Sequence, residues 1–272
     1  MKKNMLIAVA GVVVVGGLAT YLFWPQSQPE PVQVQAPPPP HPPKAEAPKV
    51  VVTPPAPPSL PLQPVQPPQP TLANSDSFMI DALAGLAGNK SLMKVFHTDR
   101  VIKRIVATID NLPDLRAPMK LMPVERAPGN FITAGEESDL TISASNAARY
   151  TPYVKIAQAI DAKKLVELYV RLYPLFQEAY EKLGYPKKYF NDRLIVTLDD
   201  LLAAPDIKEP VKLVQPNVFY LYADPDLEER SIGQRILMRI GSNNEAIMKA
   251  KLRELKKELM LHMHGKKVGK AA

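Results

Sequence analysis

The chain of 272 residues carries 34 Lys and Arg against 27 Asp and Glu, a formal net charge of +7, and 30 prolines. It contains no cysteine, which excludes disulfides, thiolate nucleophiles and cysteine-ligated metals. Nineteen of the prolines fall between Pro25 and Asn74, so composition divides the chain into an N-terminal segment, a proline-rich segment and a C-terminal domain.

The N-terminal segment is predicted to cross a membrane. Residues 5–24 carry no charge, and twenty helical residues span about 30 Å, the thickness of a bilayer's hydrocarbon core. Lys2 and Lys3 precede this span and Tyr21 and Trp24 lie at its far end, where aromatic rings favour the membrane interface. We therefore expect a single-pass signal-anchor with residues 1–4 in the cytoplasm. The alternative is a signal peptide cleaved near 17–19, where small residues occur.

Residues 25–74 are predicted to form a disordered proline-rich linker. Proline fixes φ and lacks an N–H, so the tract can build neither a helix nor a sheet ladder, and it favours extended polyproline II. Such a spacer is semi-rigid and would hold the following domain at a distance from the bilayer. The competing interpretation is a docking site for proline-recognising domains.

Residues 75–261 are predicted to form a mostly α-helical domain with a small β-hairpin. Asp76 or Ser77 is expected to cap a first helix that ends at Gly88, and 98–99 is expected to open a second that ends at 111–113. The hairpin is predicted within 131–142, around Gly135.

Asp161 is expected to cap the longest helix, 163–183, which Gly184 ends. Two adjoining apolar stripes, one of leucines and one of aromatic residues, predict that this helix is central. Asn191 is expected to cap the next helix, and Asp224 to begin a helix that runs to Ile240. Four further features complete the prediction: a short helix rather than a strand within 211–222, a terminator at Gly241, a final helix over 244–261, and a basic tail over 262–272.

Three phrases within this domain resemble a known family when taken together. They are ARYTPYV at 148–154, YPLFQEAYEKLGYPKKYFNDRL at 173–194 and LVQPNVFYLYADPDLEERSIGQRILMRIG at 213–241, preceded by SDSF at 75–78. The chain resembles the proteobacterial domain-of-unknown-function family 3014. The resemblance implies a membrane helix, a proline-rich linker and a periplasmic domain, and it implies no activity and no catalytic residues.

The sequence contains no recognisable catalytic, cofactor-binding or metal-binding motif. It contains no glycine-rich phosphate loop and no metal-ligand spacing, so we expect no cofactor, no metal site and no catalytic residues. His97 is interpreted as a turn or capping residue. Asp199 and Asp200 are interpreted as a solvated pair that does not converge, because helix neighbours point about 100° apart.

Six side chains are predicted to form a partner-binding groove with aromatic walls and guanidinium groups at its edge. Aromatic residues and arginine dominate binding hot spots, and prolines beside these residues would stiffen the loops. The competing account packs the tyrosines in the core and pairs the first arginine with a carboxylate such as Asp192. The six residues are Arg149, Tyr150, Tyr153, Tyr185, Tyr189 and Arg193.

We therefore expect an inner-membrane protein with a periplasmic domain that binds an envelope protein or peptidoglycan. Nucleic acid is not expected as a partner, because residues 75–248 carry 22 Lys and Arg against 23 Asp and Glu, and the basic excess lies in 249–272. Two alternatives remain open at this point. One is an envelope-spanning connector of the TonB-like, energy-transducing class, and the other is an enzyme that acts on envelope glycans through Asp or Glu.

Overall fold

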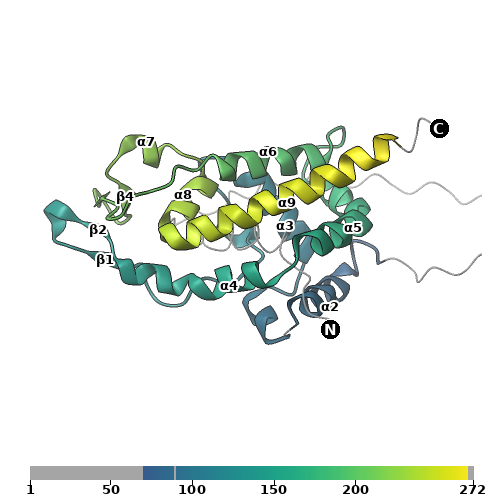
Figure 1. Cartoon of the computed structure of the whole chain (residues 1–272), viewed down its shortest axis with the longest axis horizontal. Coiled ribbons are helices and arrows are strands. Elements are labelled where there is room, and N and C mark those ends of the chain that lie inside the picture. Colours follow the sequence, from purple (N-terminus) through teal and green to yellow (C-terminus); the bar gives the residue numbers. More distant parts are fainter. Residues whose placement is uncertain (1–69, 89, 269–272) are drawn as a thin grey trace, which may run out of the picture. The chain divides into compact units, whose positions relative to one another are not determined.

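The computed structural model describes residues 70–88 and 90–268, which form a helical body with two short hairpins at one end (Figure 1). The predicted membrane span 5–24, its flanking residues Lys2, Lys3, Tyr21 and Trp24, and linker residues 25–69 lie outside the described residues. Within the described ranges, no helix is long and apolar enough to cross a bilayer.

The first two helices meet at a shared polar joint. Helix α2 (Ser75–Ala87) ends at Gly88, as predicted, and η2 (Lys90–Val95) leads to α3 (Val101–Asn111). The predicted capping role of Asp76 on its own helix is wrong. Its carboxylate instead accepts the N–H groups of Arg100 and Val101, at 2.7 and 2.8 Å, and so caps the start of α3.

The centre of the domain is formed by two helices that follow each other in the sequence. Short α4 (Thr151–Ala159) precedes α5 (Ala162–Lys182), where the Asp161 carboxylate accepts the Lys164 N–H as expected. Helix α6 (Phe190–Leu202) follows, and both α5 and α6 contact α3 and the final helix α9 (Ser242–Val268). The two predicted stripes of α5 face the core: Leu165, Leu168, Leu172, Tyr169, Phe176 and Tyr180 are buried, and Tyr173 and Leu175 are partly buried against it.

The helix predicted between Asp224 and Ile240 is interrupted. The Asp224 side chain does cap the start of α7 (Pro225–Glu228), but α7 ends after one turn. A new helix, α8 (Ile232–Arg239), begins at Ser231, whose hydroxyl accepts the Gln234 N–H and donates to the Asp200 carboxylate. That tertiary hydrogen bond fixes a second cap and breaks the helix there.

The hairpins share a second, smaller core. Strands β1 (Thr133–Ala134) and β2 (Thr141–Ile142) form the predicted hairpin. The short helix favoured within 211–222 is wrong: β3 (Leu213–Val214) and β4 (Leu221–Tyr222) are antiparallel strands, and Pro216 lies in their loop. Backbone hydrogen bonds between Ile142 and Val211 and between Leu213 and Leu140 join the hairpins. Their apolar faces enclose Phe131, Val211, Leu213, Tyr222 and Met238.

The last helix crosses the body and projects beyond it (Figure 1). It follows Gly241, whose φ of 93° confirms the expected terminator, and it packs on α4, α5, α6 and α8. Its buried Met248, Leu252, Leu255 and Leu259 belong to the main core. The helix continues to Val268, past the predicted boundary at residue 261.

Candidate functional site

The first half of the predicted groove is buried. Tyr150 and Tyr153, which cap and begin α4, are 2% and 5% exposed. The Arg149 guanidinium donates to the backbone carbonyls of Pro128 and Gly129, at 3.1 and 2.8 Å. These side chains hold the 127–129 loop against η5 (Ala144–Arg149). Because both tyrosines are buried, the structure does not show a cleft with four tyrosine walls.

The second half of the predicted groove lies at the junction of α5 and α6. Arg193 bonds the carboxylate of Asp110 at 2.9 Å and also the Asp110 backbone carbonyl, which ties α6 to the end of α3. Tyr185 is partly buried and stacks on Tyr180, with ring centroids 4.6 Å apart. Tyr189 is 67% exposed. The partner-binding role of these three residues stays a prediction.

The Gln177 side chain of α5 ties the end of the loop between α5 and α6, residues 183–189, to α5. The Gln177 amide donates to the Lys188 carbonyl, and its oxygen accepts the Phe190 N–H, both at 2.9 Å. Asn191, predicted as the cap of α6, instead accepts the Tyr169 hydroxyl at 2.5 Å. The cap prediction is therefore wrong, because a glutamine from the middle of α5 satisfies the exposed backbone donor.

This loop presents an aromatic side chain among basic ones. Lys187, Lys188 and Tyr189 are exposed, and the Lys188 ammonium lies over the Tyr185 ring, 5.1 Å from its centroid. Val196, in the second turn of α6, is also exposed. We call residues 183–189 together with Val196 the Tyr189 surface.

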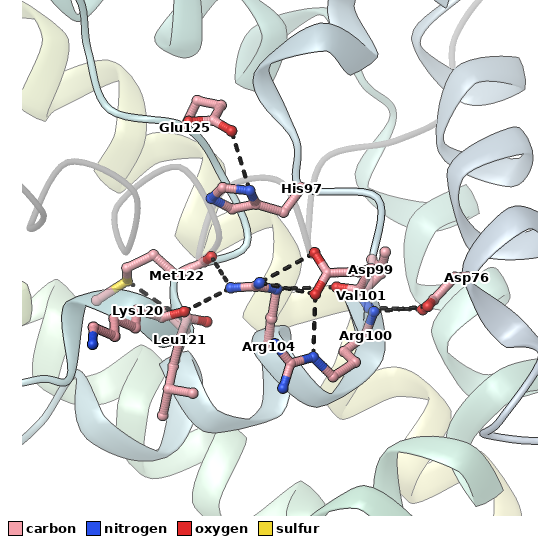
Figure 2. Close-up of polar contacts among 11 residues, drawn as sticks. Asp76, His97, Asp99, Arg100, Val101, Arg104, Lys120, Leu121, Met122 and Glu125 are labelled. Atoms are coloured by element: carbon pink, nitrogen blue, oxygen red, sulfur yellow. Dashed lines mark hydrogen bonds and ion pairs between the residues drawn. The ribbon is translucent and has the colours of Figure 1, made fainter.

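Figure 2 shows a polar cluster around Arg104 that was not predicted from the sequence. Arg104 donates to both carboxylate oxygens of Asp99 and to the carbonyls of Lys120 and Met122. Hydrogen bonds from Arg104 and Arg100 lower the pKa of Asp99. The hydrogen bonds to the two carbonyls fasten the 119–125 segment to α3.

His97 lies at the edge of this Arg104 cluster (Figure 2). Its Nδ1 is 3.1 Å from Glu125 Oε1, and its backbone N–H bonds the Pro123 carbonyl. The residue therefore lies in the extended segment between η2 and α3, where it bridges two neighbouring segments, and the turn or capping role expected from the sequence is not seen.

The acidic pair on α6 diverges, as expected, but only Asp199 is solvated and the interpretation of Asp200 as a solvated residue is wrong. Asp199 faces solvent and pairs with Lys256 of α9, whereas Asp200 accepts the Ser231 hydroxyl and the Gln234 amide. Burial raises the pKa of Asp200, and its hydrogen bonds partly oppose that shift. Among residues 70–88 and 90–268, no group of three or more His, Cys, Asp or Glu residues could hold a metal ion.

The described residues thus define a mostly helical domain whose α5–α6 loop exposes Lys187, Lys188 and Tyr189 together. A family model described as a protein of unknown function (DUF3014) matches residues 101–256, from the start of α3 into α9. The chain belongs to this family, and the match includes all six residues of the predicted groove. No curated protein and no solved structure matched the chain.

Proposed function

We propose that the chain is an inner-membrane-anchored envelope protein whose helical domain binds a protein or cell-wall partner through the Tyr189 surface. The observation that carries the proposal is the 67% exposure of Tyr189 on a loop fixed by Gln177. When a partner covers a large solvent-exposed aromatic side chain, the free energy of the complex is lowered. Because the backbone around it is already ordered, little entropy is lost on binding.

The anchor and the linker support the envelope location. The charge-free residues 5–24 follow Lys2 and Lys3, and no positive charge occurs again before Lys44, which favours a cytoplasmic N-terminus. The proline-rich tract that follows would give the domain reach away from the bilayer. Reporter enzymes active only in the periplasm, fused after Asn74 and after Ala272, should both be active. Two inactive but stably expressed fusions would contradict this orientation.

Partner binding is tested by in-cell crosslinking of the full chain and purification in detergent. We expect Tyr189→Ala to lose the crosslinked partner while its melting temperature stays within about 2 °C of the parent, as for surface substitutions in general. The matched control is Val218→Ala, which truncates another exposed residue, 79% accessible, on the β3–β4 loop. Capture of the same partner by Tyr189→Ala and the parent in equal amounts would refute the role of this surface.

A further inference from the structure

A hollow of about 250 Å³ lies between the first turns of α9 and the loop that follows α6. One face of α9 supplies Ser242, Glu245, Ala246, Lys249 and Arg253, and the loop supplies Asp206 and Ile207. The volume is slightly below the roughly 300–1,000 Å³ of pockets for drug-sized ligands, so it suits a smaller molecule. We call it the α9 hollow.

The floor of the α9 hollow is a buried ion pair. Glu245 and Lys249, four residues apart, are 2% and 3% exposed, and Glu245 Oε1 lies 2.7 Å from Lys249 Nζ. The same ammonium donates to the Ala204 carbonyl at 2.6 Å and to Asp206 Oδ1 at 2.7 Å. These two hydrogen bonds hold the loop and the Asp206 carboxylate in position, whereas Glu245 Oε1 pairs with the ammonium by charge and has no hydrogen-bond partner among the described residues.

Two exposed side chains of opposite charge lie at the rim of the α9 hollow. The Asp206 side chain is 91% exposed, and only its Oδ1 is engaged by Lys249. Arg253 is exposed and, among the described residues, its guanidinium makes no hydrogen bond or ion pair. Both rim groups line the same hollow, and the pKa of Asp206 is lowered chiefly by Lys249 and to a smaller extent by Arg253.

The charges that surround the hollow balance, with two carboxylates and two cations. An anion would be attracted by Arg253 and repelled by Asp206 and Glu245, and a cation would experience the reverse. A molecule that carries both charges satisfies both rim groups. Ile207 and Ala246 provide an apolar surface that its carbon atoms can contact.

We propose that the α9 hollow binds a small zwitterion, an amino acid or a short peptide end, with its carboxylate on Arg253 and its ammonium on Asp206. The site is built from other residues than the Tyr189 surface, and it does not depend on the proposed function. Arginine recognises carboxylates through paired N–H donors, and carboxylates accept the hydrogen bonds of ammonium groups. Lys249 acts as a positioning residue for the rim.

Calorimetric titration of the full chain in detergent tests the proposal. The probes are glycine, β-alanine and 4-aminobutyrate, in which the two charges lie progressively further apart, together with acetate and methylammonium, which carry one charge each. We expect at least one zwitterion to bind with a Kd about tenfold or more below that of either single-charge probe, as a charge-assisted hydrogen bond predicts. Absence of binding by all three zwitterions, or acetate binding as tightly as the best of them, would overturn the proposal.

Variants at the rim complete the test, and Asn at position 206 keeps an oxygen that can accept the hydrogen bond from Lys249. Arg253→Ala and Asp206→Asn should each weaken the best zwitterion by about tenfold or more, and circular dichroism should show an unchanged fold because both side chains are exposed. The matched control is Lys257→Ala, which removes an exposed cation one turn further along α9 and should leave Kd unchanged. An equal loss in Lys257→Ala would indicate nonspecific attraction to the basic helix and would also overturn the proposal.

Discussion

The Asp76 carboxylate accepts the backbone N–H of Val101 at 2.8 Å, so a residue in the first turn of α2 caps the start of α3. Arg100, which precedes α3, has a φ of 52° and carries no capping side chain of its own. Two N–H groups at this helix end, those of Arg100 and Val101, are therefore satisfied by a residue 24 and 25 positions earlier. The joint couples the formation of α2 to that of α3.

Removal of this cap should destabilise the domain. Asp76→Ala leaves the N–H groups of Arg100 and Val101 without their acceptor, and loss of a helix cap costs about 1–2 kcal/mol. Urea unfolding monitored by circular dichroism measures the change. Ser77→Ala, in the same turn and exposed, is the control and should change the free energy of unfolding by less than about 0.5 kcal/mol. Equal effects of the two substitutions would refute the capping role.

The two arginines of α8 share one carboxylate, that of Glu228. Arg235 pairs with Glu228 Oε1, and Arg239 Nη2 lies 3.9 Å from Glu228 Oε2, while both arginines are buried. Glu228→Gln removes the negative charge and should cost about 3 kcal/mol, the lower end for breaking a buried pair, because 22% of the Glu228 side chain remains exposed. Chemical denaturation measures the loss. The exposed neighbour substitution Glu229→Gln should be nearly neutral, and a neutral Glu228→Gln would contradict the prediction.

Gly233 marks a close contact between helices. A Cβ at this position would lie 2.5 Å from Leu201 Cδ2 and 3.0 Å from the Leu112 carbonyl oxygen. Gly233→Ala should therefore destabilise the domain by about 1–3 kcal/mol, as overpacking does in other cores. The control is Gly85→Ala in α2, where nothing lies within 4 Å and alanine should add up to about 1 kcal/mol of stability. Thermal unfolding of both variants should show opposite shifts, and shifts of the same sign would count against the packing argument.

Asp200 should give the stability a measurable pH dependence. Its pKa in the folded domain is raised above the ordinary 3.8, chiefly by burial. The folded state therefore retains the proton to higher pH than the unfolded state, so this contribution is full below 3.8 and is lost as pH rises through the raised value. Asp200→Asn removes it. The free energy of unfolding of the parent, minus that of the variant, should fall as pH rises above 3.8, and a difference independent of pH would refute the assignment.

Local signals predicted those parts of the fold that depend on neighbouring residues. Asp161 caps α5, Gly184 and Gly241 take positive φ after helices, and the apolar stripes of α5 face the core. Each of these features needs only residues within one or two turns. The stripe argument succeeded because two rows of apolar residues must be buried whatever covers them.

Features that depend on distant partners were missed. Asp76 and Asn191 have the residue types of helix caps, yet both are used by segments far along the chain. Ser231 breaks the helix expected over 224–240 because Asp200 holds its hydroxyl. The groove hypothesis failed for Tyr150 and Tyr153 on the same ground, since exposure depends on which segments cover a tyrosine. Tyr189, at the end of a loop held by Gln177, was the part of that hypothesis that remained accessible.

The position of α9 has a consequence for synthesis of the protein. Helices α4, α5 and α6 all pack on α9, which leaves the ribosome after them (Figure 1). Until α9 has been translated, the apolar faces of the earlier helices that it will cover are exposed on the nascent chain. Among them are the side chains that will surround Leu252 and Leu255 of α9. Incomplete chains of this kind expose surface that aggregates readily. Protection of the emerging domain by a chaperone would therefore matter most in the interval between translation of α6 and translation of α9.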